Sequence, residues 1–274
     1  MNKPHAISRH SAGFTLVEAI MVIAITGILS AVVAVFIKGP VEGYFDSARR
    51  ADLTDAADTT LKRIARDVQT ALPNSLRADV GGACVEFLPV VGGGRYRNAQ
   101  SSALSGNVFD FTTISAFSFD VLADNRLGSL PAGTNHVVVY NLGFSGADAY
   151  NGDNRRSISS VSGTSPNMTV ALNAGVQFPF ESPGKRFQVI ADNAVVYSCS
   201  GSNLLRATRS ITTPMAACPV AGTTMVSNVD CANSSFKYTP AVSPRNGLLT
   251  LVLTLTQSGE SVRLYHEVHV ENVP

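Results

Sequence analysis

The sequence lacks several features that mark common classes of enzyme and binding protein. Its formal net charge is only +1 and 15% of its residues are charged, which does not fit the basic surface of a nucleic-acid-binding domain. No Cys-x-x-Cys pair is present, so a zinc site is not expected. Neither a Gly-x-Ser-x-Gly elbow nor a Gly-Lys-Ser/Thr phosphate loop occurs. We therefore predict no enzyme activity, no metal, no cofactor and no nucleic-acid partner.

Long apolar stretches are absent as well, with one exception near the N-terminus. The segment from Phe14 to Ile37 covers 24 residues and is almost wholly apolar, which is long enough for a helix to cross a bilayer. It follows a short basic head with Lys3 and Arg9. Glu18 lies inside the segment, and a carboxylate in lipid costs roughly 2.5–3.5 kcal/mol. Glu18 therefore needs either a charged partner or access to the membrane surface.

Residues 13–18 read Gly-Phe-Thr-Leu-Val-Glu and include the start of the apolar segment. This string resembles the prepilin signature of type IV pilins and of type II secretion pseudopilins. The resemblance implies that residues 1–13 are a leader, that prepilin peptidase cleaves after Gly13, and that Phe14 becomes the N-methylated first residue. It also implies that Glu18 meets the N-terminal amine of a neighbouring subunit. An alternative interpretation is an ordinary membrane anchor whose Glu18 reaches the interface.

The same resemblance implies partners and a location. The partners would be prepilin peptidase, other major and minor pilins, the inner-membrane assembly platform and membrane lipid. The chain would be a single-pass protein of the bacterial inner membrane before assembly. After assembly it would belong to a pilus in the periplasm and at the cell surface.

The apolar segment, residues 14–38, is followed by a second helical pattern over residues 39–73. Gly39 and Pro40 separate the two, and because proline removes an amide donor we predict a kink there. Apolar residues recur at helical spacing beyond this point, and the charged residues between them predict a solvated face. Pro73 predicts the end of the helix after Leu72.

Residues 74–274 are predicted to form a β-rich extracytoplasmic domain. The clearest pattern is a C-terminal hairpin that turns at Ser258-Gly259. One face of its first strand carries four leucines: Leu249, Leu251, Leu253 and Leu255. We expect this face to pack against the amphipathic part of the helix. The predicted fold class is therefore α+β, with a long N-terminal helix on an antiparallel sheet, as in type IV pilins.

Several weaker patterns predict the rest of this domain. Further strands are expected at 84–91, 108–121, 136–142, 168–172, 187–190, 194–199 and 204–211. The turn residues Asp192-Asn193 suggest that 187–190 and 194–199 form a hairpin. Loops are expected at 92–97, 143–156 and 212–247.

The four cysteines form an even set, which in an exported chain favours two disulfides. Three pairings are possible. We favour Cys218–Cys231, because it closes a short loop, and Cys84–Cys199, which would then join two predicted strands. Free buried thiols are the alternative.

Two other clusters suggest metal binding but fit it poorly. His266 and His269 are three residues apart on a predicted strand, so their rings should point to opposite faces. Residues 148–154 gather acidic and amide oxygens around Gly152, as calcium sites do, but without the spacing of an EF-hand. A polar turn is the simpler interpretation.

Three functions agree with these patterns. The first is a minor pilin that primes or caps a pilus. The segment Cys84–Arg97, together with the leader, resembles minor prepilins of the mannose-sensitive haemagglutinin (MSHA) pilus system. The second is a minor pseudopilin of a type II secretion system. The third is a tip adhesin that binds a glycan through loops around Tyr96 and Tyr150.

Overall fold

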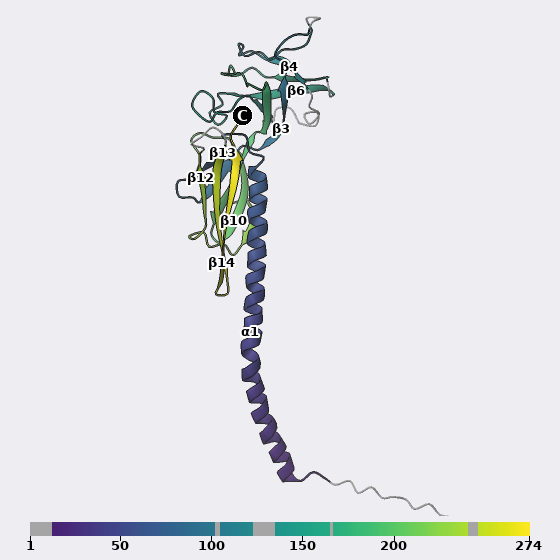
Figure 1. The fold of residues 1–274 in the computed structure, drawn as a ribbon, viewed down its shortest axis with the longest axis vertical. Coiled ribbons are helices and arrows are strands. Elements are labelled where there is room, and N and C mark those ends of the chain that lie inside the picture. Colours follow the sequence, from purple (N-terminus) through teal and green to yellow (C-terminus); the bar gives the residue numbers. More distant parts are fainter. Residues whose placement is uncertain (1–12, 102–104, 123–134, 165–166, 241–245) are drawn as a thin grey trace, which may run out of the picture. The chain divides into compact units, whose positions relative to one another are not determined.

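A computed structural model describes residues 13–101, 105–122, 135–164, 167–240 and 246–274, so most of the predicted leader, residues 1–13, lies outside the described residues. The chain divides into two compact units, Met1–Ala51 and Asp52–Pro274. Helix α1 (Leu16–Val68) begins in the first unit and ends in the second. Fourteen strands follow it within the described residues. Figure 1 shows α1 and several of these strands. The architecture is α+β and type IV pilin-like, with an apolar N-terminal helix and antiparallel β-structure.

Helix α1 continues through Gly39 and Pro40 without interruption. The kink stays a prediction. At its other end α1 stops at Val68, four residues before the predicted end. Beyond Val68 the backbone forms hydrogen bonds with residues 88–90 instead of continuing the helix. The amide of Leu72 donates to the carbonyl of Leu88 (2.8 Å), and the amide of Val90 donates to the carbonyl of Thr70 (2.9 Å).

The described strands of the second unit form three sheets, all with antiparallel neighbours. A five-stranded sheet has the order β1 (Arg77–Ala78), β2 (Cys84–Phe87), β9 (Asn193–Ser200), β10 (Asn203–Ser210), β11 (Thr223–Ser227). A three-stranded sheet contains β12 (Ser235–Thr239), β13 (Asn246–Gln257) and β14 (Glu260–Glu271).

The third sheet is a closed barrel inserted in sequence between β2 and β9. Around the barrel its strands are β3 (Val90–Tyr96), β4 (Phe117–Leu122), β7 (Asn167–Leu172), β6 (Arg155–Thr164), β5 (Asn135–Val138) and β8 (Arg186–Ala191). Aromatic side chains fill its core: Tyr96, Phe109, Phe119, Phe178 and Phe187. The predicted β-rich domain therefore contains two bodies, each with its own core.

The core of the first body joins α1 to the two open sheets. Leu53, Leu61, Ile64 and Val68 of α1 share one buried cluster with strands β2, β9 and β13. The predicted leucine face is part of it: Leu249, Leu251, Leu253 and Leu255 are all buried. The C-terminal hairpin and its packing against the helix are thus confirmed.

A small apolar cluster connects this body to the barrel. It combines Leu72 and Leu88 with Val138, Tyr150 and Ile190, all of which are buried. The two bodies of the second unit therefore share a buried apolar contact, in addition to the chain connections at β2–β3 and β8–β9.

Several predicted boundaries are wrong. The expected hairpin across Asp192 does not form, because β8 pairs with β3 and β5 whereas β9 pairs with β2 and β10. The expected glycine loop at 92–97 is mostly strand β3, and Gly93 is needed there because a Cβ would lie 2.8 Å from the carbonyl oxygen of Phe187. The strand expected at 108–121 is shorter, since β4 begins only at Phe117. The loop expected at 212–247 contains two strands, β11 and β12.

Candidate functional site

The N-terminal motif forms the capped start of α1. The amide of Glu18 donates to the hydroxyl of Thr15 (3.3 Å), and that of Ala19 donates to the carbonyl of Thr15 (3.1 Å). Thr15 is therefore the N-cap of the helix, and Glu18 takes the position that a capping box assigns to an acid. Sequence reasoning missed this role, although the Thr-x-x-Glu spacing was its signal.

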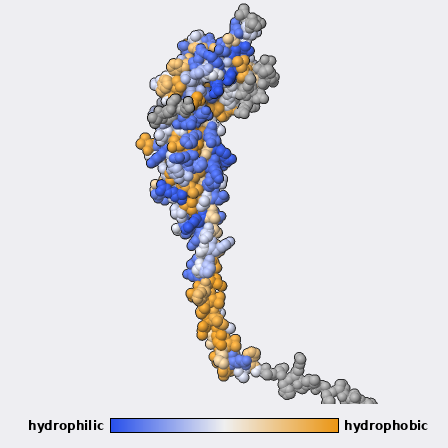
Figure 2. Space-filling view, in the orientation of Figure 1, coloured by the Kyte–Doolittle hydropathy of each residue, from blue (hydrophilic) through white to orange (hydrophobic). Residues whose placement is uncertain are grey.

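The apolar surface of the motif is uncovered. Every residue from Gly13 to Phe45 is exposed, including Phe14 at 78% and Leu16 at 79%. Figure 2 shows mostly hydrophobic residues along the N-terminal part of the helix. Helix α1 is long and apolar enough to cross a membrane. An exposed apolar surface of this extent marks contact with lipid or with other proteins. No described residue makes an ion pair with Glu18, so its carboxylate is available to such a partner.

At its other end α1 is held by a charged contact with the five-stranded sheet. Asp67 accepts hydrogen bonds from the hydroxyl of Tyr197 (2.5 Å) and from Nε of Arg206 (3.0 Å). Burial and the neighbouring Asp67 carboxylate together raise the pKa of Tyr197, so its proton stays in this bond. The charged residues of this part of the helix are predicted to form a solvated face, and for Asp67 that prediction is wrong.

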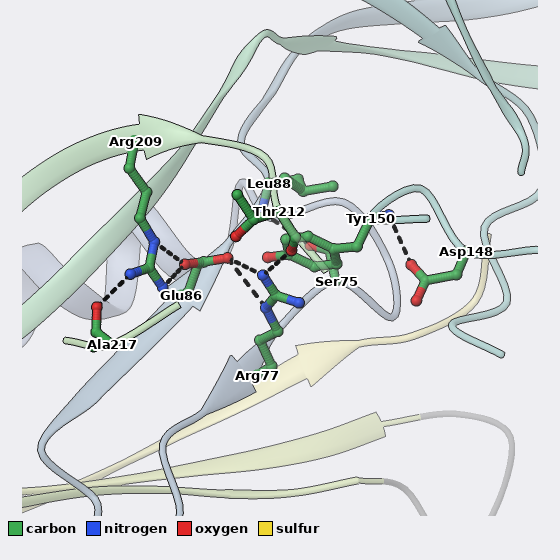
Figure 3. Close-up of polar contacts among 9 residues, drawn as sticks. All are labelled: Ser75, Arg77, Glu86, Leu88, Asp148, Tyr150, Arg209, Thr212 and Ala217. Carbon is green, nitrogen blue, oxygen red and sulfur yellow. Dashed lines mark hydrogen bonds and ion pairs between the residues drawn. The ribbon is translucent and has the colours of Figure 1, made fainter. Parts of the chain in front are cut away.

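A buried ionic cluster lies on the outer face of the same sheet, around Glu86 (Figure 3). Glu86 is 0% exposed. Its Oε1 accepts from Arg77 (Nε at 3.1 Å, Nη2 at 2.5 Å) and its Oε2 from Arg209. Arg77 lies directly opposite Glu86 in the β1–β2 register. Because both carboxylate oxygens are bound to guanidinium groups, Glu86 is not accessible to a ligand, and its role is structural.

The cluster extends to the barrel through Tyr150. The guanidinium of Arg77 lies 3.5 Å from the centre of the Tyr150 ring, a cation–π contact. Burial, together with the charge of Glu86, raises the pKa of Tyr150 well above its usual value. The Tyr150 amide donates to Asp148 (2.8 Å), whose own pKa burial raises. Glu86 therefore links the open sheet to the barrel through one chain of contacts.

A connecting segment, residues 211–222, covers this cluster, and we call it the strap. Three of its carbonyl groups accept hydrogen bonds from the sheet: Thr212 from Arg77, Ala217 from Arg209, and Pro219 from Ser198. Cys218 of the strap forms a disulfide with Cys84. The strap thus seals the outer face of the sheet over Glu86.

The disulfides differ from the favoured pairing. The structure contains Cys84–Cys218 and Cys199–Cys231, not Cys84–Cys199 and Cys218–Cys231. The reason is the alternation of side chains along a strand. Val85 and Tyr197 oppose each other and face the core, so Cys84 faces outward to the strap. Cys199, two residues after Tyr197, faces the core side, where Cys231 also packs.

We expect peptide mapping of the unreduced protein to find these two pairs. Replacing Cys84 and Cys218 together by serine should lower the free energy of unfolding by about 2–5 kcal/mol, because the strap would then be held by hydrogen bonds alone. Urea denaturation of the full-length protein in detergent measures this loss. Detection of a Cys84–Cys199 peptide would contradict the assignment.

The other positions that the sequence singles out have structural surroundings in the described part of the chain. The side chains of Tyr96 and Tyr150 are 0% and 6% exposed, so neither ring is open to a glycan, and binding by the loops around them stays a prediction. In the turn 148–154, Asp153 accepts from the amides of Gly146 (2.8 Å) and Asp148 (3.2 Å), as in a polar turn. The alternation of exposure along β14 leaves His266 partly buried and His269 exposed.

The comparison with known families gives one result. Residues 8–34 match the family described as "prokaryotic N-terminal methylation motif". No curated protein and no solved structure matches the chain. From Gly13 onward the matched residues form the capped, exposed start of α1, and the match supports a type IV pilin-like or pseudopilin-like protein.

This motif implies processing by prepilin peptidase and association with other pilins, and together with the apolar helix it fits an anchor in the inner membrane. Prepilin-like proteins are structural proteins, not enzymes. The match ends at residue 34, so it carries no information on the two β bodies.

Proposed function

We propose that this protein is a minor type IV pilin that primes or caps a pilus of the MSHA type. The observation that carries the proposal is the methylation motif at the start of an exposed apolar helix, with Glu18 one turn inside it. Cleavage after Gly13 would create an amine on Phe14. In a filament of packed helices, that amine and the Glu18 carboxylate of the next copy can neutralise each other.

The size of the second unit, Asp52–Pro274, supports a minor role. The inserted barrel makes this unit large, and many copies of it would crowd a filament. A priming or capping subunit occupies few positions, so it tolerates this size. The MSHA assignment rests on the resemblance of Cys84–Arg97 and the leader to the minor prepilin MshO. The pseudopilin of a type II secretion system is the alternative, since it uses the same kind of helix.

Processing gives the first test of this proposal. Mass spectrometry of the protein from cells with an active prepilin peptidase should find a chain that begins at N-methylated Phe14. A peptidase-deficient strain is the control and should retain residues 1–13. A mature protein that still carries Met1 in the active strain would contradict the proposal.

Gene deletion gives the second test and separates the alternatives. We expect surface pili, counted by electron microscopy, to be lost or strongly reduced, and to return when the intact gene is restored. Normal numbers of pili together with a loss of protein secretion would favour the pseudopilin.

A further inference from the structure

The outer face of the barrel holds two arginine side chains directly opposite each other. Arg95 of β3 and Arg186 of β8 are partners in the antiparallel register, and both are exposed. Opposed residues of this kind have Cβ atoms about 4.5–5.5 Å apart, and like charges placed so close are destabilising. Among the described residues, neither guanidinium takes part in a hydrogen bond or an ion pair.

A groove of about 590 Å³ lies along this arginine pair. Its floor is formed by Gly92, Gly93 and Gly94 of β3, which carry no side chains, so the backbone is open to an occupant. Gly93 is also required by the close approach of β8.

A third polar group points to an occupant of the groove. Gln188 lies opposite Gly93, two residues along β8 from Arg186, and it lines the groove. Its Oε1 is buried and lacks a hydrogen-bond partner within the described part of the chain. Buried polar atoms without partners are uncommon in folded proteins and indicate a missing ligand or water.

We propose that Arg95, Arg186 and Gln188 form a binding site for a small carboxylate- or sulfate-bearing molecule of the size of a sugar acid. The planar guanidinium fork matches the oxygens of both anionic groups. A bound anion would cancel the repulsion within the arginine pair. The groove is larger than a bare anion needs and falls in the range of about 300–1,000 Å³ that is usual for small-molecule ligands.

Thermal unfolding of the full-length protein in detergent micelles tests this site. Sodium glucuronate should raise Tm by about 2–5 °C at saturation, relative to sodium chloride at the same ionic strength. Glucose, a neutral sugar of similar size, should leave Tm unchanged. Sodium sulfate supplies an anion without a sugar ring, and we expect it to raise Tm less than sodium glucuronate does.

Three variants decide whether the groove is responsible. Arg95→Gln and Arg186→Gln should each lose most of the glucuronate response, while their Tm at low salt without ligand equals or exceeds that of the wild type, because the repulsion is gone. Arg263→Gln removes an exposed arginine of β14 and should keep the full response. An unchanged Tm in glucuronate, or an equal rise in all three variants, would overturn the proposal.

Discussion

Replacing Glu86 by glutamine should lower the free energy of unfolding by about 3–5 kcal/mol, the cost of breaking a buried ion pair by removing one partner. The substitution preserves shape but removes the charge that Arg77 and Arg209 share. Both guanidinium groups are largely buried, with side-chain exposures of 22% and 17%, so water can solvate them only in part. Two positive charges would then face each other beneath the strap.

The loss of stability should extend beyond the open sheet. Arg77 also stacks on Tyr150 of the barrel and donates to Thr212 of the strap. If the guanidinium moves to reach water, both contacts weaken. Because 1 kcal/mol corresponds to about 2–4 °C for a unit of this size, Tm should fall by roughly 6–20 °C.

Glu181→Gln is the matched control for this experiment. Glu181 also pairs with a cation, Lys185, but its side chain is 55% exposed whereas that of Glu86 is 1% exposed. Exposed pairs contribute about 0–1 kcal/mol, so the control should unfold close to the wild type. Urea denaturation of both variants measures the difference. A Glu86→Gln protein within about 1 kcal/mol of the wild type would show that the cluster is not a structural centre.

Replacing Glu18 by alanine should leave the protein processed and membrane-inserted but reduce its incorporation into filaments by at least about tenfold. In a packed helical core, an N-terminal ammonium without its carboxylate is a buried unpaired charge, which costs several kcal/mol. Membrane insertion itself should improve slightly, since the acid is lost from the apolar segment. Cell fractionation and immunoblotting of sheared filaments measure the two properties separately.

The position of Glu18 three residues after the N-cap Thr15 provides a way to separate structure from charge. Glutamine can replace glutamate in a capping box but carries no charge. Glu18→Gln should therefore preserve the start of α1 and still fail to assemble. Glu42→Ala is the matched control, because Glu42 belongs to the same helix, is exposed, and makes a loose ion pair with the exposed Lys38 at 3.8 Å. Normal assembly of Glu18→Gln would contradict pairing between Glu18 and the amine.

The disulfides and the barrel show where local patterns are insufficient. Cys218 and Cys231 are close in sequence, which favoured their pairing. The face of the sheet decides otherwise, because Cys84 and Cys199 lie on adjacent strands but point away from each other. The turn signal at Asp192 is present in the sequence, but both edges of β8 are occupied by β3 and β5.

By itself, the sequence determined the elements whose information is local. The apolar length of α1, the Gly-Phe-Thr-Leu-Val-Glu motif and the alternating leucines of β13 each lie within one contiguous segment, and periodicity alone distinguishes helix from strand there. Only the tertiary structure decided the inserted barrel, the cysteine pairs and the partners of Glu86. These depend on contacts between residues far apart in the chain, such as Arg77 with Tyr150 and Glu86 with Arg209, and the free energy of such contacts arises only after the strands have found their neighbours.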